Sequence, residues 1–133
     1  MKICKTILCV DDDPDDLQLL REAIERIDSS YTIIEAYDGE DGLRRLNNMK
    51  ESNELPCLIV LDINMPKMDG KQAFVSIKSD EILAQVPVVI FSTSNSAMDK
   101  MFFSKKNAEY ITKPIDFFQL IDVANRLLSF CSN

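Results

Sequence analysis

The stretch KTILCVDDDPDD, residues 5–16, joins an apolar run to five aspartates within six positions. The run at 5–10 is rich in aliphatic and β-branched residues, which predicts a buried strand. Directly after it, Asp13 is placed to cap a helix, with Pro14 in the first turn and Asp16 three residues on. The stretch therefore predicts a strand that ends in acidic residues and leads straight into a helix.

The same alternation of a short strand and a helix continues along the chain. Apolar residues at helical spacing fill the segments between strands, and Asp116 is a candidate cap for the last helix. The four further strands are expected at residues 31–37, 57–61, 86–91 and 109–112. Five strands alternating with five helices predict an α/β fold with a parallel sheet covered by helices on both faces.

Composition and charge exclude several classes of function. The chain has no histidine, which excludes Ser-His-Asp catalysis, His-ligated zinc and a phosphohistidine of its own. It has only three glycines, so neither of the glycine-rich nucleotide-binding motifs can be written. The formal net charge of −7 disfavours binding to nucleic acid or to an anionic membrane. Small ions and protein partners remain as ligands.

Length and cysteine usage suggest one domain in a reducing compartment. We expect residues 1–133 to form a single domain with no output domain, and we expect no signal peptide, because acidic residues end the first apolar stretch too soon for one. No apolar run is long enough to cross a membrane, so a cytoplasmic location is expected. The four cysteines, at positions 4, 9, 57 and 131, show no C-x-x-C spacing. We expect them to be reduced and mostly buried rather than disulfide-bonded.

Polar side chains follow four of the five predicted strands. They are Asp11 and Asp12, Asp62, Ser92 with Thr93, and Lys113. Because parallel strands end at one edge of a sheet, we expect these side chains to meet in one crevice. Carboxylate oxygens are the ligands that Mg²⁺ prefers, and a cation would relieve the repulsion among the acids.

Asp62 is the best candidate for a nucleophile in this crevice. It stands alone at its strand end, whereas Asp11 and Asp12 are adjacent. A bound metal ion and the Lys113 ammonium would neutralise the charge on a transferring phosphoryl group. The sequence therefore predicts that phosphorus is attacked by the Asp62 carboxylate.

Four stretches together resemble the receiver domain of two-component response regulators. They are ILCVDDDPDD (7–16), LIVLDINMPKMDG (58–70), VPVVIFSTS (86–94) and YITKP (110–114). They occur in the family's order and span nearly the whole chain. The resemblance implies a flavodoxin-like fold with strand order 2-1-3-4-5, and the length resembles a stand-alone regulator of the chemotaxis-messenger type.

The resemblance also implies a role for each matching residue. Asp62 would accept a phosphoryl group from a histidine on a sensor histidine kinase or a histidine phosphotransfer protein. The Mg²⁺ ion, for which Mn²⁺ can substitute, would be held by Asp11, Asp12, Asp62 and the backbone carbonyl of Asn64. Lys113 would contact a phosphoryl oxygen, and a cis peptide bond before Pro114 would aim it.

Two further residues match the family's switch positions. Ser92 aligns with the hydroxyl that turns toward the phosphoryl group, although STS (92–94) leaves Thr93 open as an alternative. Tyr110 matches the aromatic residue that moves inward with it. Where the family often has Gly-Ala, this chain has Asn107 and Ala108, and asparagine tolerates the left-handed geometry.

The helix before this turn carries several large apolar residues. Phe102 and Phe103 are consecutive and cannot both face inward. We expect Met98 and Met101 to be part of the core.

The predicted function is a phosphoryl-accepting switch and not an enzyme in the ordinary sense. It would act as a monomer or weak dimer, lose the phosphoryl group slowly to water, and signal through a changed surface to an unknown downstream protein. One alternative is an aspartate-nucleophile phosphatase, but such enzymes need a second acid where Asn64 stands. The other is a degenerate receiver that serves as a constitutive binding module.

Overall fold

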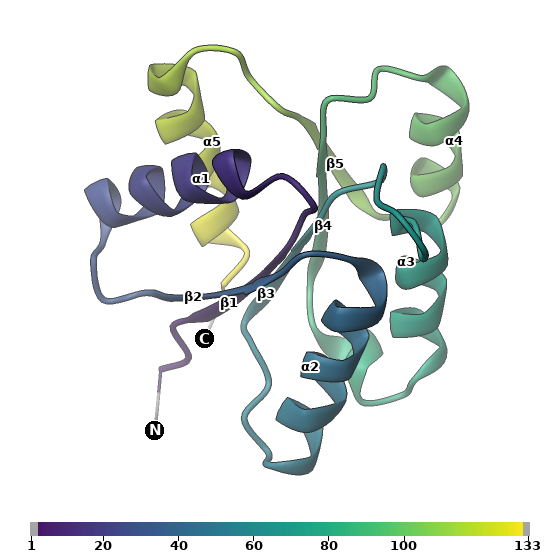
Figure 1. Ribbon diagram of the computed structural model, residues 1–133. Coiled ribbons are helices and arrows are strands. Elements are labelled where there is room, and N and C mark those ends of the chain that lie inside the picture. Colours follow the sequence, from purple (N-terminus) through teal and green to yellow (C-terminus); the bar gives the residue numbers. More distant parts are fainter. Residues whose placement is uncertain (1–2, 132–133) are drawn as a thin grey trace.

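In the computed structural model, which describes residues 3–131, five parallel strands form one sheet in the order β2-β1-β3-β4-β5 (Figure 1). The strands are β1 Thr6–Val10, β2 Thr32–Ala36, β3 Leu58–Leu61, β4 Val88–Ser92 and β5 Glu109–Thr112. The helices are α1 Pro14–Ile27, α2 Gly39–Glu51, α3 Gly70–Ser79, α4 Ala97–Lys105 and α5 Phe117–Ser129, with a short 3₁₀ turn at Leu83–Gln85. The predicted fold class and strand order are confirmed. Within the described residues, no helix has both the length and the apolar character needed to span a bilayer.

The sheet is covered on both faces, with α1 and α5 on one side and α2, α3 and α4 on the other (Figure 1). Side chains of β1 alternate between the two layers: Ile7 and Cys9 pack toward α1 and α5, whereas Leu8 and Val10 pack toward α2 and α3. All four are almost completely buried. Burial on both faces explains why the central strands are continuous apolar runs.

Two aspartates cap the helices α1 and α5, which begin near the carboxyl edge of the sheet. Asp13 caps α1 as predicted, because its Oδ1 accepts the backbone N–H groups of Asp15 and Asp16 at 3.0 and 3.4 Å. Asp116 caps α5 by accepting the amide of Phe118 at 2.7 Å. The first turn of each helix therefore begins close to a strand end.

Helix α3 begins beside the backbone of Asp62. Asp69 and Gln72 form a reciprocal capping box, with hydrogen bonds of 2.9 and 3.0 Å. A Cβ atom added to Gly70 would lie 2.2 Å from the carbonyl oxygen of Asp62 and 2.7 Å from the Cα of Ile63. Only glycine allows α3 to approach the strand end this closely.

Helix α4 differs in part from expectation. Phe103 is fully buried and Phe102 is half-buried, so the two side chains do not both face inward, as predicted. Met98 and Met101 are 78% and 57% exposed, and their expected place in the core is wrong. Successive helical residues turn by 100°, so both methionines lie far around the helix from Phe103, the only buried residue of α4.

The turn after α4 has the predicted geometry. Asn107 has a φ of 55°, in the left-handed region that asparagine tolerates. The residue therefore replaces the family's glycine without breaking the connection to β5.

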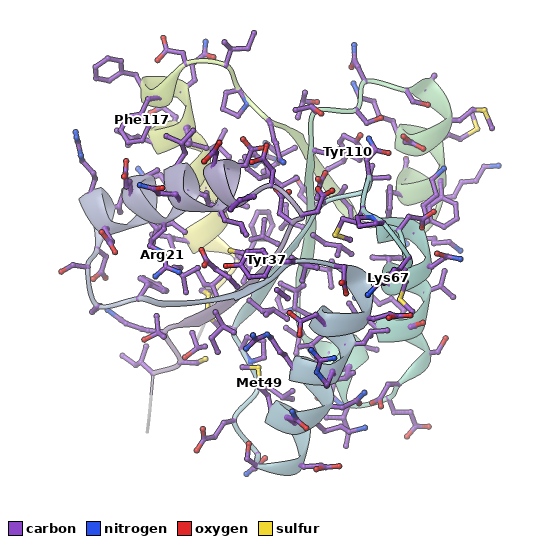
Figure 2. All side chains as sticks on the ribbon, in the orientation of Figure 1. Arg21, Tyr37, Met49, Lys67, Tyr110 and Phe117 are labelled. Carbon is purple, nitrogen blue, oxygen red and sulfur yellow. A yellow bond between two sulfur atoms is a disulfide. The ribbon has the colours of Figure 1, made fainter. Side chains whose placement is uncertain are left out.

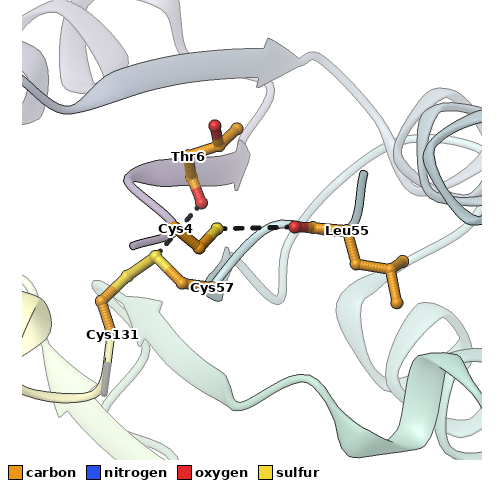
Figure 3. Close-up of a disulfide and its surroundings, with 5 residues drawn as sticks. All are labelled: Cys4, Thr6, Leu55, Cys57 and Cys131. Carbon is orange, nitrogen blue, oxygen red and sulfur yellow. Dashed lines mark hydrogen bonds between the residues drawn. A yellow bond between two sulfur atoms is a disulfide. The ribbon is translucent and has the colours of Figure 1, made fainter. Parts of the chain in front are cut away.

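The expectation that all four cysteines are reduced is wrong. Cys57, directly before β3, and Cys131, after α5, form a disulfide with their Cα atoms 4.9 Å apart (Figure 3). That spacing suits a disulfide. The two positions are 74 residues apart and share no motif, so only the folded chain brings them together. Cys9, by contrast, is buried, and burial raises the pKa of its thiol to about 12.

Candidate functional site

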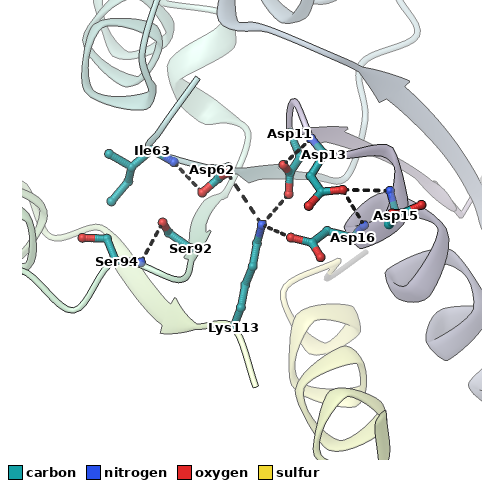
Figure 4. A network of polar contacts seen from close by, with 9 residues as sticks. All are labelled: Asp11, Asp13, Asp15, Asp16, Asp62, Ile63, Ser92, Ser94 and Lys113. Carbon is teal, nitrogen blue, oxygen red and sulfur yellow. Dashed lines mark hydrogen bonds and ion pairs between the residues drawn. The ribbon is translucent and has the colours of Figure 1, made fainter. Parts of the chain in front are cut away.

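The strand ends bring the predicted site residues together at the carboxyl edge of the sheet (Figure 4). Asp11 follows β1, Asp62 follows β3, Ser92 ends β4 and Lys113 follows β5. The strand register explains the convergence, because Val10 pairs with Leu61, and Ser92 pairs with Thr112. Side chains that are up to 102 residues apart in the sequence thus share one crevice.

Three carboxylates form the acidic part of the crevice. Asp11, Asp12 and Asp62 each offer an oxygen, and these oxygens lie within 4.8 Å of one another. Asp11 and Asp62 are only 6% and 8% exposed, whereas Asp12 is exposed to solvent. Oxygen ligands of this number and charge fit a hard divalent cation such as Mg²⁺ or Mn²⁺, which would complete its shell with water.

Backbone amides orient one oxygen of each buried acid. Asp11 Oδ1 accepts the amide of Asp13 at 3.0 Å, and Asp62 Oδ1 accepts the amide of Ile63 at 2.8 Å. The other oxygen of each carboxylate, Oδ2, faces the Lys113 ammonium. One oxygen of each acid is thus held by the backbone while the other lines the crevice.

Lys113 is the cation of the site. Its Nζ lies 2.6 Å from Asp11 Oδ2, 2.8 Å from Asp16 Oδ2 and 3.6 Å from Asp62 Oδ2, and its side chain is 9% exposed. Burial alone would lower the pKa of the ammonium. The hydrogen bonds to Asp11 and Asp16 outweigh burial and hold the Lys113 pKa above its ordinary value.

Asp16 is the site residue that the sequence did not reveal. The pattern assigns it only to the start of α1, beside the cap, yet its carboxylate reaches the Lys113 ammonium. The one sequence feature that points to a role in the site is its position in the first turn of a helix that starts at the edge of the sheet. The ion pair itself depends on how close β5 comes to α1.

Burial makes the negative charge of Asp11 energetically costly. The pKa of Asp11 is raised to about 6, mainly because burial disfavours its charged form. The hydrogen bonds from Lys113 and from the amide of Asp13 oppose the rise, and the negative charge of Asp62 adds to it. A bound divalent cation would favour the charged form, which is consistent with the donor set.

Ser92 and Tyr110 are connected through Ser94. Ser92 is fully buried at the end of β4, and its Oγ accepts the amide of Ser94 at 3.2 Å. The Tyr110 hydroxyl donates to the carbonyl oxygen of Ser94 at 2.8 Å, and the half-buried Tyr110 ring lies against Phe103. Tyr110 is labelled in Figure 2. Thr93 is exposed, so of the two candidate switch hydroxyls only that of Ser92 is buried at the strand end.

The predicted cis peptide bond before Pro114 is wrong. No peptide bond between residues 3 and 131 is cis, so the Lys113–Pro114 bond is trans. Trans is the lower-energy isomer of an X–Pro bond. With this bond in trans, the long side chain of Lys113 still reaches Asp11 and Asp62. The side chain of Asn64 is exposed, and the role of its carbonyl as a metal ligand stays a prediction.

Comparison with known proteins gives a consistent result. Residues 7–125 match the family model described as "Response regulator receiver domain". The chain is 30% identical over 124 residues to protein PilH of Pseudomonas aeruginosa, a match that covers 92% of this chain and 97% of PilH. It spans less than half the length of two longer regulators that it also resembles.

Solved structures show the same similarity in three dimensions. The chain is 31% identical to the phosphorylated cyanobacterial phytochrome response regulator RcpA, with a TM-score of 0.86 over 96% of this chain and 93% of that one. It is 28% identical to the Mn²⁺-bound form of response regulator Rcp1, with a TM-score of 0.80 over 95% and 93% of the two chains.

Proposed function

The chain belongs to the response regulator receiver family, and from this premise we propose that Asp62 accepts a phosphoryl group from the phosphohistidine of a sensor histidine kinase or a histidine phosphotransfer protein. The reaction takes place in the cytoplasm, and the phosphorylated protein signals to a downstream protein through an altered surface. One observation carries the proposal: the Lys113 ammonium lies 3.6 Å from Asp62, in the same crevice as the carboxylates of Asp11 and Asp12.

In this proposal the two oxygens of Asp62 have separate tasks. The amide of Ile63 holds Oδ1, so Oδ2, on the side of Lys113, is the nucleophile. As the new oxygen–phosphorus bond forms, the phosphorus–nitrogen bond to the donor histidine breaks and the imidazole keeps the electron pair. Lys113 then pairs with a phosphoryl oxygen, because its ammonium is already fixed beside the attacking atom.

The acidic residues of the site would hold a divalent cation. Asp11, Asp12, Asp62 and the carbonyl of Asn64 would bind Mg²⁺, or Mn²⁺ in its place, and the ion would supply positive charge that offsets the charge on the transferring group. The support for this assignment is the close set of three carboxylate oxygens and the raised pKa of Asp11.

The switch is proposed to run from Ser92 to Tyr110. Ser92 Oγ accepts the amide of Ser94, and its hydroxyl hydrogen is available to donate to a phosphoryl oxygen on Asp62. Ser94 also accepts the Tyr110 hydroxyl on its carbonyl oxygen. Ser94 donates its own hydroxyl to Asp99 of α4, so a shift of Ser92 toward the phosphoryl group would act on both β5 and α4 through Ser94.

Exposed apolar side chains beside the crevice favour a protein donor over a small-molecule substrate. Ile115 and Phe118 are 104% and 75% exposed, and Leu19 of α1 is 44% exposed. Leu19, Pro114 and Ile115 line a cavity of about 180 Å³, and Pro114 directly follows Lys113 in the chain. A helix that carries the phosphohistidine can dock against this apolar surface.

The test is intact-mass analysis after incubation with Mg²⁺ and acetyl phosphate. We expect one acid-labile phosphoryl group on the wild type and none on Asp62→Asn. Asp15→Asn is the matched control, because Asp15 is exposed and outside the carboxylate cluster, and it should be phosphorylated normally. Phosphorylation of Asp62→Asn would overturn the proposal. Continuous turnover of a phosphate monoester by the wild type would favour a phosphatase instead.

A further inference from the structure

The Cys57–Cys131 disulfide lies at the amino-terminal edge of the sheet, opposite to the acidic crevice. Cys57 directly precedes β3 and Asp62 directly follows it, so the two sites are about 16 Å apart along the strand. Figure 3 shows the bond between the start of β3 and the end of α5. The disulfide therefore ties the last turn of α5 to the centre of the sheet.

A disulfide is unexpected in a protein that acts beside a histidine kinase in the cytoplasm, where thiols are kept reduced. The disulfides that do form in such a compartment are usually transient and redox-sensing. We propose that Cys57–Cys131 is a reversible redox modification site that exchanges with dithiols of the thioredoxin class and with glutathione, and that its reduction releases the end of α5 from β3. The expected compartment, but nothing else in this inference, rests on the proposed function.

The exposure of the two cysteines indicates which of them the thiolate of a reductant attacks. Cys57 is half-buried whereas Cys131 is only 7% exposed, so the proposed attack is at the sulfur of Cys57, the more exposed residue of the two. That sulfur lies 3.3 Å from the carbonyl oxygen of Thr6, and Thr6 lines a cavity of about 400 Å³ at this edge. The reductant's thiolate is therefore expected to attack Cys57 rather than Cys131.

The exchange is balanced in two steps. The reductant's thiolate bonds to the sulfur of Cys57, the disulfide breaks, and Cys131 leaves as a thiolate that takes up a proton. The second thiol of the reductant then attacks the mixed disulfide and frees Cys57, which is also protonated. In sum, two electrons and two protons pass to the protein, and the dithiol becomes a disulfide. Oxidised glutathione reverses the sequence and is itself reduced to two thiols.

Reduction should loosen the end of α5 without unfolding the domain. The helix keeps its buried contacts through Leu120, Ala124 and Leu127, none of which depends on the disulfide. The bond closes a long loop, and its loss should lower Tm by roughly 10 °C. Phosphorylation of Asp62 should be unchanged, because the carboxylate lies at the other edge of the sheet.

The experiment measures thiols and Tm on the full chain across a series of ratios of reduced to oxidised glutathione. Alkylation of the denatured protein followed by mass analysis should find two thiols in the oxidised form, and all four cysteines as thiols in the reduced form. Tm should fall together with the loss of the disulfide. Cys131→Ser should have the lower Tm at every ratio, and Cys57→Ser should match it.

Cys4→Ser is the control, because Cys4 lies at the same edge but outside the disulfide. It should keep the full redox response. Four alkylated thiols at every glutathione ratio, or a disulfide that neither glutathione nor thioredoxin reduces, would overturn the proposal. Asp62→Asn should show the same redox response as the wild type, so a failure of the phosphoryl proposal is measured separately.

Discussion

The hydroxyl of Tyr110 donates a hydrogen bond to the carbonyl oxygen of Ser94, 2.8 Å away, and ties β5 to the loop after β4. Ser94 also donates its amide to Ser92 Oγ at 3.2 Å and its hydroxyl to Asp99 of α4 at 2.7 Å. Asp99 in turn pairs with Lys71 of α3 at 2.6 Å. A single residue thus connects the candidate switch serine with two helices, and small movements at the sheet edge have a direct route to α4.

Replacing Tyr110 by phenylalanine should cost about 1 kcal/mol of unfolding free energy, because the Ser94 carbonyl loses its donor in a half-buried place. Urea denaturation measures the loss. Tyr37→Phe is the matched control, since Tyr37 is exposed and donates only to Glu35 on the surface. Its effect should stay within about 0.5 kcal/mol. If the two variants lost the same amount of unfolding free energy, the Tyr110 hydrogen bond would contribute no more to stability than the exposed one of Tyr37.

Replacing Lys113 by methionine should destabilise the protein by about 3–5 kcal/mol at neutral pH without divalent cations. The substitution leaves the buried carboxylates of Asp11 and Asp62 without their ammonium. Adding Mg²⁺ should restore part of the loss, because the ion supplies positive charge to the same oxygens. Lys105→Met, at an exposed position of α4, should change stability by less than about 0.5 kcal/mol. If the urea midpoint of Lys113→Met equalled that of the wild type, this account of the crevice would be refuted.

Asp12→Asn should raise stability in the absence of divalent cations and abolish the stabilisation by Mg²⁺. The exposed Asp12 carboxylate is close to two other acids, so removing its charge should gain about 0.5–1 kcal/mol after solvent screening. The wild type should gain stability with Mg²⁺ concentration, as expected for a ligand that binds the folded state. Thermal melts with and without Mg²⁺ measure both effects.

Asp15→Asn should change stability in the opposite direction to Asp12→Asn. Asp15 lies in the first turn of α1, where a negative charge favours the helix dipole, and the change should lower stability slightly. If both variants shifted Tm in the same direction, repulsion within the cluster would not be the cause.

The parts of this molecule that follow from local pattern could be predicted from the sequence. Strand ends are marked by the switch from apolar to polar residues, and the topology of a parallel sheet places those ends at one edge. The crevice with Asp11, Asp62 and Lys113 follows from these two facts. Asp13 and Asp116 also cap their helices as predicted, because capping depends on the next two or three residues.

Features set by distant segments could not be predicted. The ion pair of Asp16 depends on the approach of β5, and the disulfide of Cys57 depends on where α5 ends. Helical spacing predicts an apolar stripe that includes Met98 but not which side of α4 meets the sheet, and Met98 is exposed. The cis isomer before Pro114 is implied only by the family resemblance, and Lys113 reaches its partners from the trans isomer.

Gly70→Ala should cost about 2–3 kcal/mol and slow the phosphorylation of Asp62 by acetyl phosphate. The added methyl group would lie 2.2 Å from the Asp62 carbonyl oxygen, so the strand end or α3 must move. Gly42→Ala is the comparison, because the three atoms nearest to its added methyl group are side-chain atoms of Val10, at 3.0 Å and beyond, and alanine favours the helix. Its cost should be smaller, with normal phosphorylation. Similar phosphorylation rates for both variants would show that the site tolerates the displacement.

Ile115→Asp should separate docking from chemistry. Ile115 is fully exposed beside the crevice, so its replacement should leave the unfolding free energy within about 0.5 kcal/mol of the wild type. Phosphorylation by acetyl phosphate, which needs no docking surface, should be unchanged. Transfer from a phosphorylated histidine kinase that acts on the wild type should fall by about tenfold or more, because a buried apolar contact is lost and a charge is introduced.

Ile82→Asp is the matched control for this experiment. Ile82 is 48% exposed and adjoins the 3₁₀ turn before β4, away from the carboxyl edge. It should leave transfer from both donors intact. If Ile115→Asp slowed acetyl phosphate and the kinase equally, the new carboxylate would be acting on the crevice itself, through repulsion of the incoming phosphoryl group. If it slowed neither, the kinase would have to approach Asp62 without touching the apolar surface formed by Leu19, Pro114 and Ile115.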